Sequence, residues 1–228
     1  MAATAILGVA AIAVIVAGAI SRRENAETRR RFILAGFATV GAEDIALSWS
    51  KTSMKYSVVG NRALEVNDHI SESMSRLSQL AGVAVDRGSP ADIAFMFDEN
   101  IFLDLKHRPE KFISAGFTSA QVNFLKEHMP PSGEGCAMTA FSNSGHDIVL
   151  AVVLAQSPNA DCILQGAFNS FGIQLVNQAE RVRAEQSLCA LYSARSVGVR
   201  KVSDVSEFNG TAAAHCLRPQ HDSIAKEP

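Results

Sequence analysis

The sequence predicts an α+β protein in which a mixed or antiparallel sheet packs with helices, preceded by an N-terminal transmembrane helix. Short apolar runs, alternating or continuous, are typical of strands, and longer stretches with apolar residues three and four positions apart are typical of helices. The third observation is an unbroken apolar run at the N-terminus. A chain of 228 residues is long enough for one domain with a sizeable core and an anchor.

The charge balance of the chain is close to neutral. There are 21 Lys and Arg residues against 23 Asp and Glu residues. No basic arm or patch typical of nucleic-acid binding stands out. We therefore expect no nucleic-acid partner.

Residues 1–21 are predicted to be a transmembrane anchor or a signal sequence. Residues 2–20 are apolar or small throughout and would form about 28 Å of helix, enough to cross the core of a bilayer. Ala17-Gly18-Ala19 is similar to a cleavage site, but no basic residue precedes the run, so a retained anchor is favoured. The expected partners are the membrane, through this helix, and an envelope protein.

Two signals conflict over the side of the membrane on which the domain lies. Arginines at positions 22, 23, 29, 30 and 31 favour the cytoplasm by the positive-inside rule. The even number of cysteines, none in a CxxC pair, favours disulfides in an oxidising compartment. Residues 28–33 resemble a twin-arginine export signal, but a first domain helix over 26–39 is favoured. We expect an inner-membrane protein with its domain in the periplasm or extracytoplasmic space, or secreted if the N-terminus is cleaved.

The first half of the globular part is predicted to alternate between extended segments and helices. Extended segments or strands are expected over residues 45–49, 55–59 and 91–97. Helices are expected over residues 64–81, closed by Gly82, and from a Thr118-Ser119 cap to His128. A capped turn is expected after the strand ending at Phe97. Trp49 is expected in the core, and His69 on the surface.

The second half is predicted to be a hairpin followed by two helices. Its strands are expected over residues 136–141 and 147–155, the second central and covered on both faces. Helices are expected over residues 161–173 and 180–192, the latter with Val182, Leu188 and Leu191 inward. Residues 208–228 are expected to be a loosely ordered tail.

The helix over 161–173 has polar or small residues in its middle, where a hydrolase of this layout would carry metal ligands and a base. Those positions hold Gln165, Gly166 and Asn169, while Asp161 is expected to cap the helix and Gly172 to end it. Cys162 enters this helix beside the hairpin that begins at Cys136, so we expect a disulfide between them. A second disulfide, between Cys189 and Cys216, is expected to tie the tail back to the domain.

Three stretches are similar to a bacterial family known only as domain of unknown function 2927. They are residues 32–37 followed by 42–43 and Trp49, residues 162–173, and residues 191–195 with Gly198. The resemblance implies a fold similar to that of zincin metallopeptidases over residues 26–207. In place of the family's two glutamates, however, this chain has Gln165 and Gly166, neither of which can be a general base or a metal-bound carboxylate. No HExxH motif occurs in the sequence.

These departures lead to an expectation of a catalytically inactive zincin-like binding or scaffolding module with no catalytic, cofactor-binding or metal-ligating residues. Its binding surface is expected in the former cleft or around residues 98–105. The alternative is a divergent metal-dependent hydrolase. The candidate site residues for that alternative are Glu43, Asp44, Asp98, His146 and Asp147.

Overall fold

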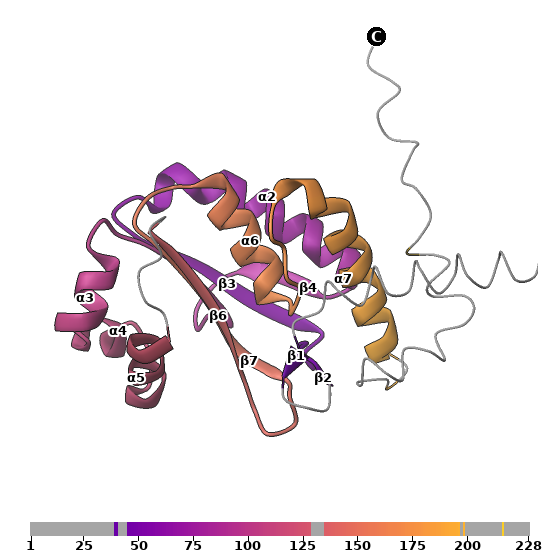
Figure 1. Ribbon diagram of the computed structural model, residues 1–228, viewed down its shortest axis with the longest axis horizontal. Helices are drawn as coiled ribbons and strands as arrows, with labels where there is room; N and C mark the ends of the chain where they lie inside the picture. The colour runs from indigo at the N-terminus through magenta and orange to yellow at the C-terminus, as the bar shows by residue number, and fades with distance from the viewer. Residues whose placement is uncertain (1–38, 41–44, 129–134, 197, 199–215, 217–228) are drawn as a thin grey trace, which may run out of the picture. The chain divides into compact units, whose positions relative to one another are not determined.

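The fold is built on a five-stranded mixed sheet in the order β4-β3-β5-β7-β6. Its strands are β3 (Ser53–Gly60), β4 (Ala84–Arg87), β5 (Ile93–Phe97), β6 (Cys136–Ser142) and β7 (Ile148–Ala155). Strands β4, β3, β5 and β7 run parallel to one another, whereas β6 pairs antiparallel with β7. The computed structural model describes residues 39–40, 45–128, 135–196, 198 and 216 (Figure 1).

Helices cover both faces of this sheet. They are α2 (Ala63–Ala81), α3 (Ile101–His107), α4 (Glu110–Ser114), α5 (Ser119–His128), α6 (Ala160–Ser170) and α7 (Arg181–Ser196), with a short 3₁₀ helix, η1 (Gln178–Glu180), before α7. Figure 1 shows α2, α6 and α7 on one side of the sheet and α3, α4 and α5 on the other. The expected α+β class is therefore confirmed, with a mixed sheet.

The central strand β5 faces a separate core on each side of the sheet. All five of its residues are buried. Ala94 and Met96 pack with α3, α4 and α5, together with Phe112 and Leu125 from those helices. Because successive side chains of a strand point to opposite faces, Phe95 and the other odd-numbered residues face the α2, α6 and α7 layer. The alternation of large apolar residues along this strand had indicated only the core that faces α2, α6 and α7.

Several predicted elements agree with the structure within a few residues. Helix α2 is amphipathic as expected, with Val66, Ile70 and Met74 buried, and Gly82 ends it in the left-handed conformation at φ 64°. Helix α5 begins after Thr118, whose Oγ1 accepts a 3.2 Å hydrogen bond from the backbone N–H of Gln121. Strand β7 is buried over its last five residues, Ala151 to Ala155, between β5 and β6.

Other predictions were wrong in detail. Strand β4 was not predicted, because its four residues form a short, largely exposed edge with little apolar pattern. Thr39 cannot end a helix over 26–39, since Thr39–Val40 is strand β1, which pairs with β2 (Ile45–Ala46). Val182 was expected to face inward but is 68% exposed, because the buried stripe of α7 passes through Ala184, Leu188 and Leu191.

The predicted anchor over 1–21, the first 38 residues generally, and the tail over 208–228 apart from Cys216 lie outside the described residues. Within the described part of the chain, no helix combines the length and apolar character needed to cross a membrane.

Candidate functional site

Helix α6 begins at an asparagine cap and is tied to the edge of the sheet by a disulfide. The side-chain oxygen of Asn159 accepts hydrogen bonds from the backbone N–H groups of Asp161 and Cys162, at 2.8 and 3.2 Å. Asn159, and not the predicted Asp161, is therefore the cap residue. The disulfide between Cys136 and Cys162 joins the first residue of β6 to the first turn of the helix, with 6.1 Å between the Cα atoms.

The middle of α6 packs against the sheet. A Cβ atom added to Gly166 would lie 2.6 Å from Cγ2 of Val153 on β7, which is too close for any real side chain. Close packing against the sheet therefore accounts for a glycine at this position. Gln165 is half-buried, and its side-chain amide donates a 3.0 Å hydrogen bond to the carbonyl oxygen of Val176. Asn169, one turn later on the same side, is also half-buried.

The chain after α6 turns at Gly172, which has φ +80°. A Cβ atom there would lie 1.9 Å from the carbonyl oxygen of Leu47, so only glycine permits this approach of the two segments. The left-handed turn expected from the sequence is confirmed. Its role is to bring the end of α6 directly against residues 46–49, which precede β3.

A buried hydrogen-bond network fixes this contact. Trp49, 1% exposed as expected for a core residue, donates from its indole Nε1 to the carbonyl oxygen of Ser170 at 2.6 Å. The backbone N–H of Trp49 donates to the hydroxyl of Tyr192 at 3.3 Å, and that hydroxyl lies 3.5 Å from the carbonyl oxygen of Phe171. Burial raises the pKa of the Tyr192 phenol, which therefore stays protonated as a donor.

Arg195 extends this network to the start of β7. Its guanidinium donates to Oγ of Ser48 and to Oδ1 of Asp147, and the side chains of Arg195 and Asp147 are only 13% and 15% exposed. Ser48 in turn forms an isolated parallel bridge with Asp147. Trp49 and Gly172 thus fix the end of α6 against residues 46–49, and Arg195 joins this segment to the start of β7.

The candidate hydrolase residues do not converge. Asp98 follows the carboxyl end of β5 and Asp147 precedes β7, and because these strands are parallel the two carboxylates lie at opposite ends of the sheet, about 30 Å apart along the strand direction. Asp98 accepts from the backbone N–H of Asn100 at 2.9 Å, which confirms the capped turn. His146 lies in the β6–β7 turn at φ 60°. Glu43 and Asp44 lie outside the described residues.

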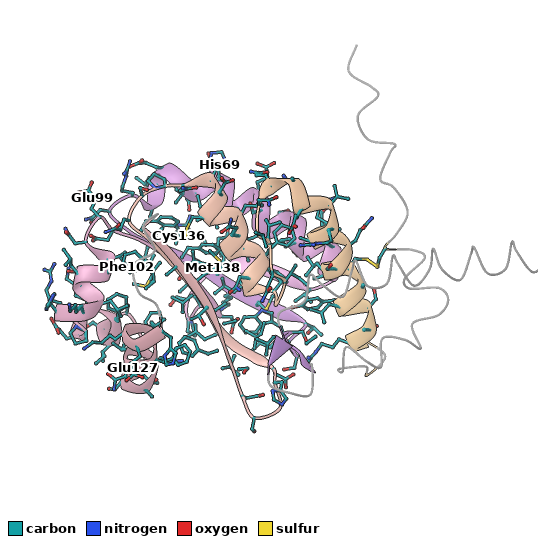
Figure 2. The ribbon with its side chains drawn as sticks, viewed as in Figure 1. His69, Glu99, Phe102, Glu127, Cys136 and Met138 are labelled. Atoms are coloured by element: carbon teal, nitrogen blue, oxygen red, sulfur yellow. A yellow bond between two sulfur atoms is a disulfide. The ribbon has the colours of Figure 1, made fainter. Side chains whose placement is uncertain are left out.

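The described residues form a groove of about 410 Å³ between α2, α6 and the start of α7. We call it the helical groove. Its inner wall is apolar, with Leu77, Ile163, Leu164 and Phe168, and its rim carries the charged or titratable residues His69, Glu72, Arg76, Arg181 and Glu185. His69 is exposed, as predicted, on the outer side of α2 (Figure 2). Sequence reasoning missed the groove because its residues come from four separate elements, α2, α6, η1 and α7, and no single local pattern indicated a groove.

Ion pairs lie along one side of the helical groove. Glu185 accepts from Arg76 at 3.0 Å and from Arg181 at 3.2 Å, so two guanidinium groups share one carboxylate. The side chains of both arginines are at least one-third exposed. Ion pairs of arginines with this much exposure contribute little to stability.

One carboxylate is buried away from the groove. Asp104 on α3 is 3% exposed and accepts from Lys111 and Arg108, which close over it from solvent. The hydrogen bond from Lys111, followed by that from Arg108, holds the pKa of Asp104 below its ordinary value of 3.8, against the opposing effect of burial. This cluster ties α3 to α4 and is structural.

Both predicted disulfides are present, and they suggest an oxidising environment outside the cytoplasm. The second joins Cys189 on α7 to Cys216, with 5.6 Å between the Cα atoms. Among the described residues, no group of three or more His, Cys, Asp or Glu side chains is arranged to hold a metal ion.

The fold is of the α+β class with a mixed five-stranded sheet, and the two disulfides suggest a domain outside the cytoplasm. Comparison with protein-family models, with curated proteins and with solved structures finds no match to this chain.

Proposed function

We propose that this chain is a non-catalytic extracytoplasmic binding domain that holds a segment of an envelope protein in the helical groove. Residues 1–21 would anchor it in the inner membrane or direct its export, as their apolar run favours. The oxidising compartment that the disulfides indicate is the compartment in which such a partner would be met.

The observation that carries the proposal is that the middle of α6 packs against the sheet and that its polar side chain is already used in a hydrogen bond. Gly166 contacts Val153 of the sheet, and the side-chain amide of Gln165 is used in a hydrogen bond to Val176. A catalytic helix must instead present acidic or imidazole groups to an open cleft. The free volume beside α6 lies on the α2 side, where the lining combines apolar side chains with charged ones.

The chemistry of the helical groove indicates the kind of segment it would hold. Leu164, which is half-buried in the lining, favours an apolar side chain from the partner, because the free energy falls when apolar surface leaves water. Arg76 and Arg181 on the rim favour an acidic residue next to that side chain. The expected ligand is therefore a protein segment with an apolar anchor flanked by Asp or Glu.

The zincin-like shell remains part of this proposal. It rests on the resemblance of residues 162–173 to the family's paired-glutamate helix, the stretch that contains most of α6.

Site-specific photo-crosslinking in cells that produce the full chain would test the binding role. A photoreactive amino acid at Ser73, in the groove, is expected to capture one partner, which is then identified and purified. The same amino acid at Ser71, exposed on α2 outside the groove, is the matched control and is expected to capture none.

The captured partner should then bind the purified chain directly. Leu164→Glu, which puts a carboxylate on the apolar inner wall, is expected to weaken that binding at least tenfold, whereas Leu103→Glu at a 56% exposed position on α3 should leave it unchanged. Equal capture from both serines, or equal loss with both glutamates, would contradict the proposal. Stoichiometric zinc that survives dialysis, together with peptide hydrolysis, would favour the divergent hydrolase.

A further inference from the structure

The two edges of the sheet differ in how they are protected. Strand β4, at one edge, has four residues, and its exposed Asp86 and Arg87 discourage pairing with another strand. Strand β6, at the other edge, has the sequence CAMTAFS, with no charged residue and no proline. Its one irregularity in pairing with β7 falls between its last two residues, Phe141 and Ser142.

Strand β6 also offers accessible surface at this edge. Among the described residues it pairs with β7 alone, and every residue from Cys136 to Phe141 is partly exposed. Cys136 and Met138 lie along it in Figure 2. The ring of Phe124, 39% exposed, contacts Phe141 edge-on with centroids 5.2 Å apart and stacks on His128. An edge strand of this length, without charged residues or proline and beside an exposed aromatic pair, is a template for strand addition.

The sequence of β6 is complementary to itself in one register. If two copies pair antiparallel about a two-fold axis through Thr139, Ala137 lies opposite Phe141 and Met138 lies opposite Ala140. Each large side chain then meets a small one, and the two Thr139 side chains form a favourable cross-strand pair. No charged residues face one another, because β6 contains none.

We propose that β6 is a homodimer interface, in which two copies of this chain join their sheets edge to edge through residues 137–141. The contact is isologous, since the same strand is used by both subunits, and it therefore closes at two copies. It lies on β6, whereas the helical groove is lined by α2, α6, η1 and α7, so that the binding role and the dimer can be tested separately.

Charge substitution at the two-fold axis tests this interface in the full chain. Sedimentation equilibrium is expected to give a dimer for the unaltered protein. Thr139→Lys and Thr139→Glu each bring like charges face to face and should weaken the dimer about fivefold or more. Mixing the two variants should restore a heterodimer, because the opposed charges then attract. Ala84→Lys, on the exposed edge strand β4, is the control and should leave the dimer unchanged.

Three results would overturn the proposal. One is an unaltered chain that sediments as a monomer. If the amides of β6 are nevertheless protected from hydrogen exchange in that monomer, a segment of the same chain or another protein occupies the edge, and the proposal is equally overturned. Another is a dimer unaffected by either charge at position 139. The last is a mixture of the two variants that fails to reassociate while each retains the melting temperature of the unaltered protein.

Discussion

The indole Nε1–H of Trp49 donates a 2.6 Å hydrogen bond to the carbonyl oxygen of Ser170, although 121 positions separate the two residues. Ser170 is the last residue of α6, where carbonyl groups have no partner within the helix. Trp49 therefore satisfies a buried acceptor and fixes the end of α6 against the segment that precedes β3. The position of α6, on which the proposed function depends, rests on this contact.

Trp49→Phe should destabilise the domain by about 2 to 4 kcal/mol, because it leaves the buried carbonyl of Ser170 without its donor and opens a small cavity. Urea unfolding followed by circular dichroism measures the change, since the variant has no tryptophan fluorescence. Ser50→Ala, at the exposed neighbouring position, is the control and should change the free energy of unfolding by less than about 0.5 kcal/mol. Equal changes in the free energy of unfolding for Trp49→Phe and Ser50→Ala would contradict the role of Trp49 in fixing the end of α6.

The ion pair between Arg195 and Asp147 should show strong energetic coupling, because both side chains are largely buried. In a double-mutant cycle, Arg195→Met and Asp147→Asn are each expected to destabilise the protein, and the double variant less than their sum by about 1 to 3 kcal/mol. The same cycle on the more exposed pair Arg62 and Glu65 provides the comparison, with an expected coupling below about 0.5 kcal/mol. Additive effects at Arg195 and Asp147 would mean that the pair does not fasten α7 to β7.

The sequence predicted those features that depend on local pattern. Helix α2 was predictable because it has an apolar stripe and ends at a glycine. Both disulfides were predictable because the cysteines belong to elements whose order already brings them together. Strand β4 was not, because a short exposed edge strand takes its structure from pairing with β3 and has little apolar pattern of its own. Asn159 was missed as the cap because Asp161, two residues later, is an equally good capping residue.

The candidate site was less predictable than the fold. A helix that ends near Gly172 was predicted correctly, but the helical groove combines elements that lie far apart in the sequence, α2, α6 and α7 among them. The partners of Arg195 were equally hidden, because Ser48 and Asp147 are 147 and 48 positions away. No local pattern encodes such contacts, which arise only when the elements pack.

Acid should release the contact between α3 and α4. The pKa of Asp104 is lower in the folded protein than its ordinary 3.8, so the ion pairs stabilise the fold fully above that value and lose their effect as pH falls through the folded pKa. Asp104→Asn should therefore destabilise the protein at pH 6, and the difference from the unaltered chain should shrink below pH 3.8. A difference that stays constant from pH 6 to about pH 2 would show that the carboxylate charge is unimportant.

The Cys136–Cys162 disulfide should contribute about 3 kcal/mol to the free energy of unfolding, since it closes a loop with a sequence separation of 26. The variant Cys136→Ser/Cys162→Ser is expected to lose this amount, measured by urea unfolding. Non-reducing peptide mapping of the unaltered chain should give only the pairs Cys136–Cys162 and Cys189–Cys216. Free thiols at Cys136 and Cys162 would show that this disulfide is absent. The main argument for an oxidising compartment would then be lost.

Close packing at Gly166 can be tested through its contact with Val153. Gly166→Ala should destabilise the protein, because the added Cβ lies 2.6 Å from Cγ2 of Val153. In a Val153→Ala background the same change should become neutral or favourable, since the space is then free and Ala is a better helix former by about 1 kcal/mol. Gly166→Ala that is equally harmful in both backgrounds would mean that Val153 is not the obstacle.

The most direct test restores the two carboxylates that the family resemblance leads one to expect. Gln165→Glu alone, at a half-buried position, should be tolerated. Gln165→Glu/Gly166→Glu should lower the melting temperature by about 10 °C or more, because burying an unpaired carboxylate costs several kcal/mol. This variant should neither retain zinc after dialysis nor hydrolyse peptides. Unchanged melting together with one tightly bound zinc would contradict the packed helix and with it the binding-domain account.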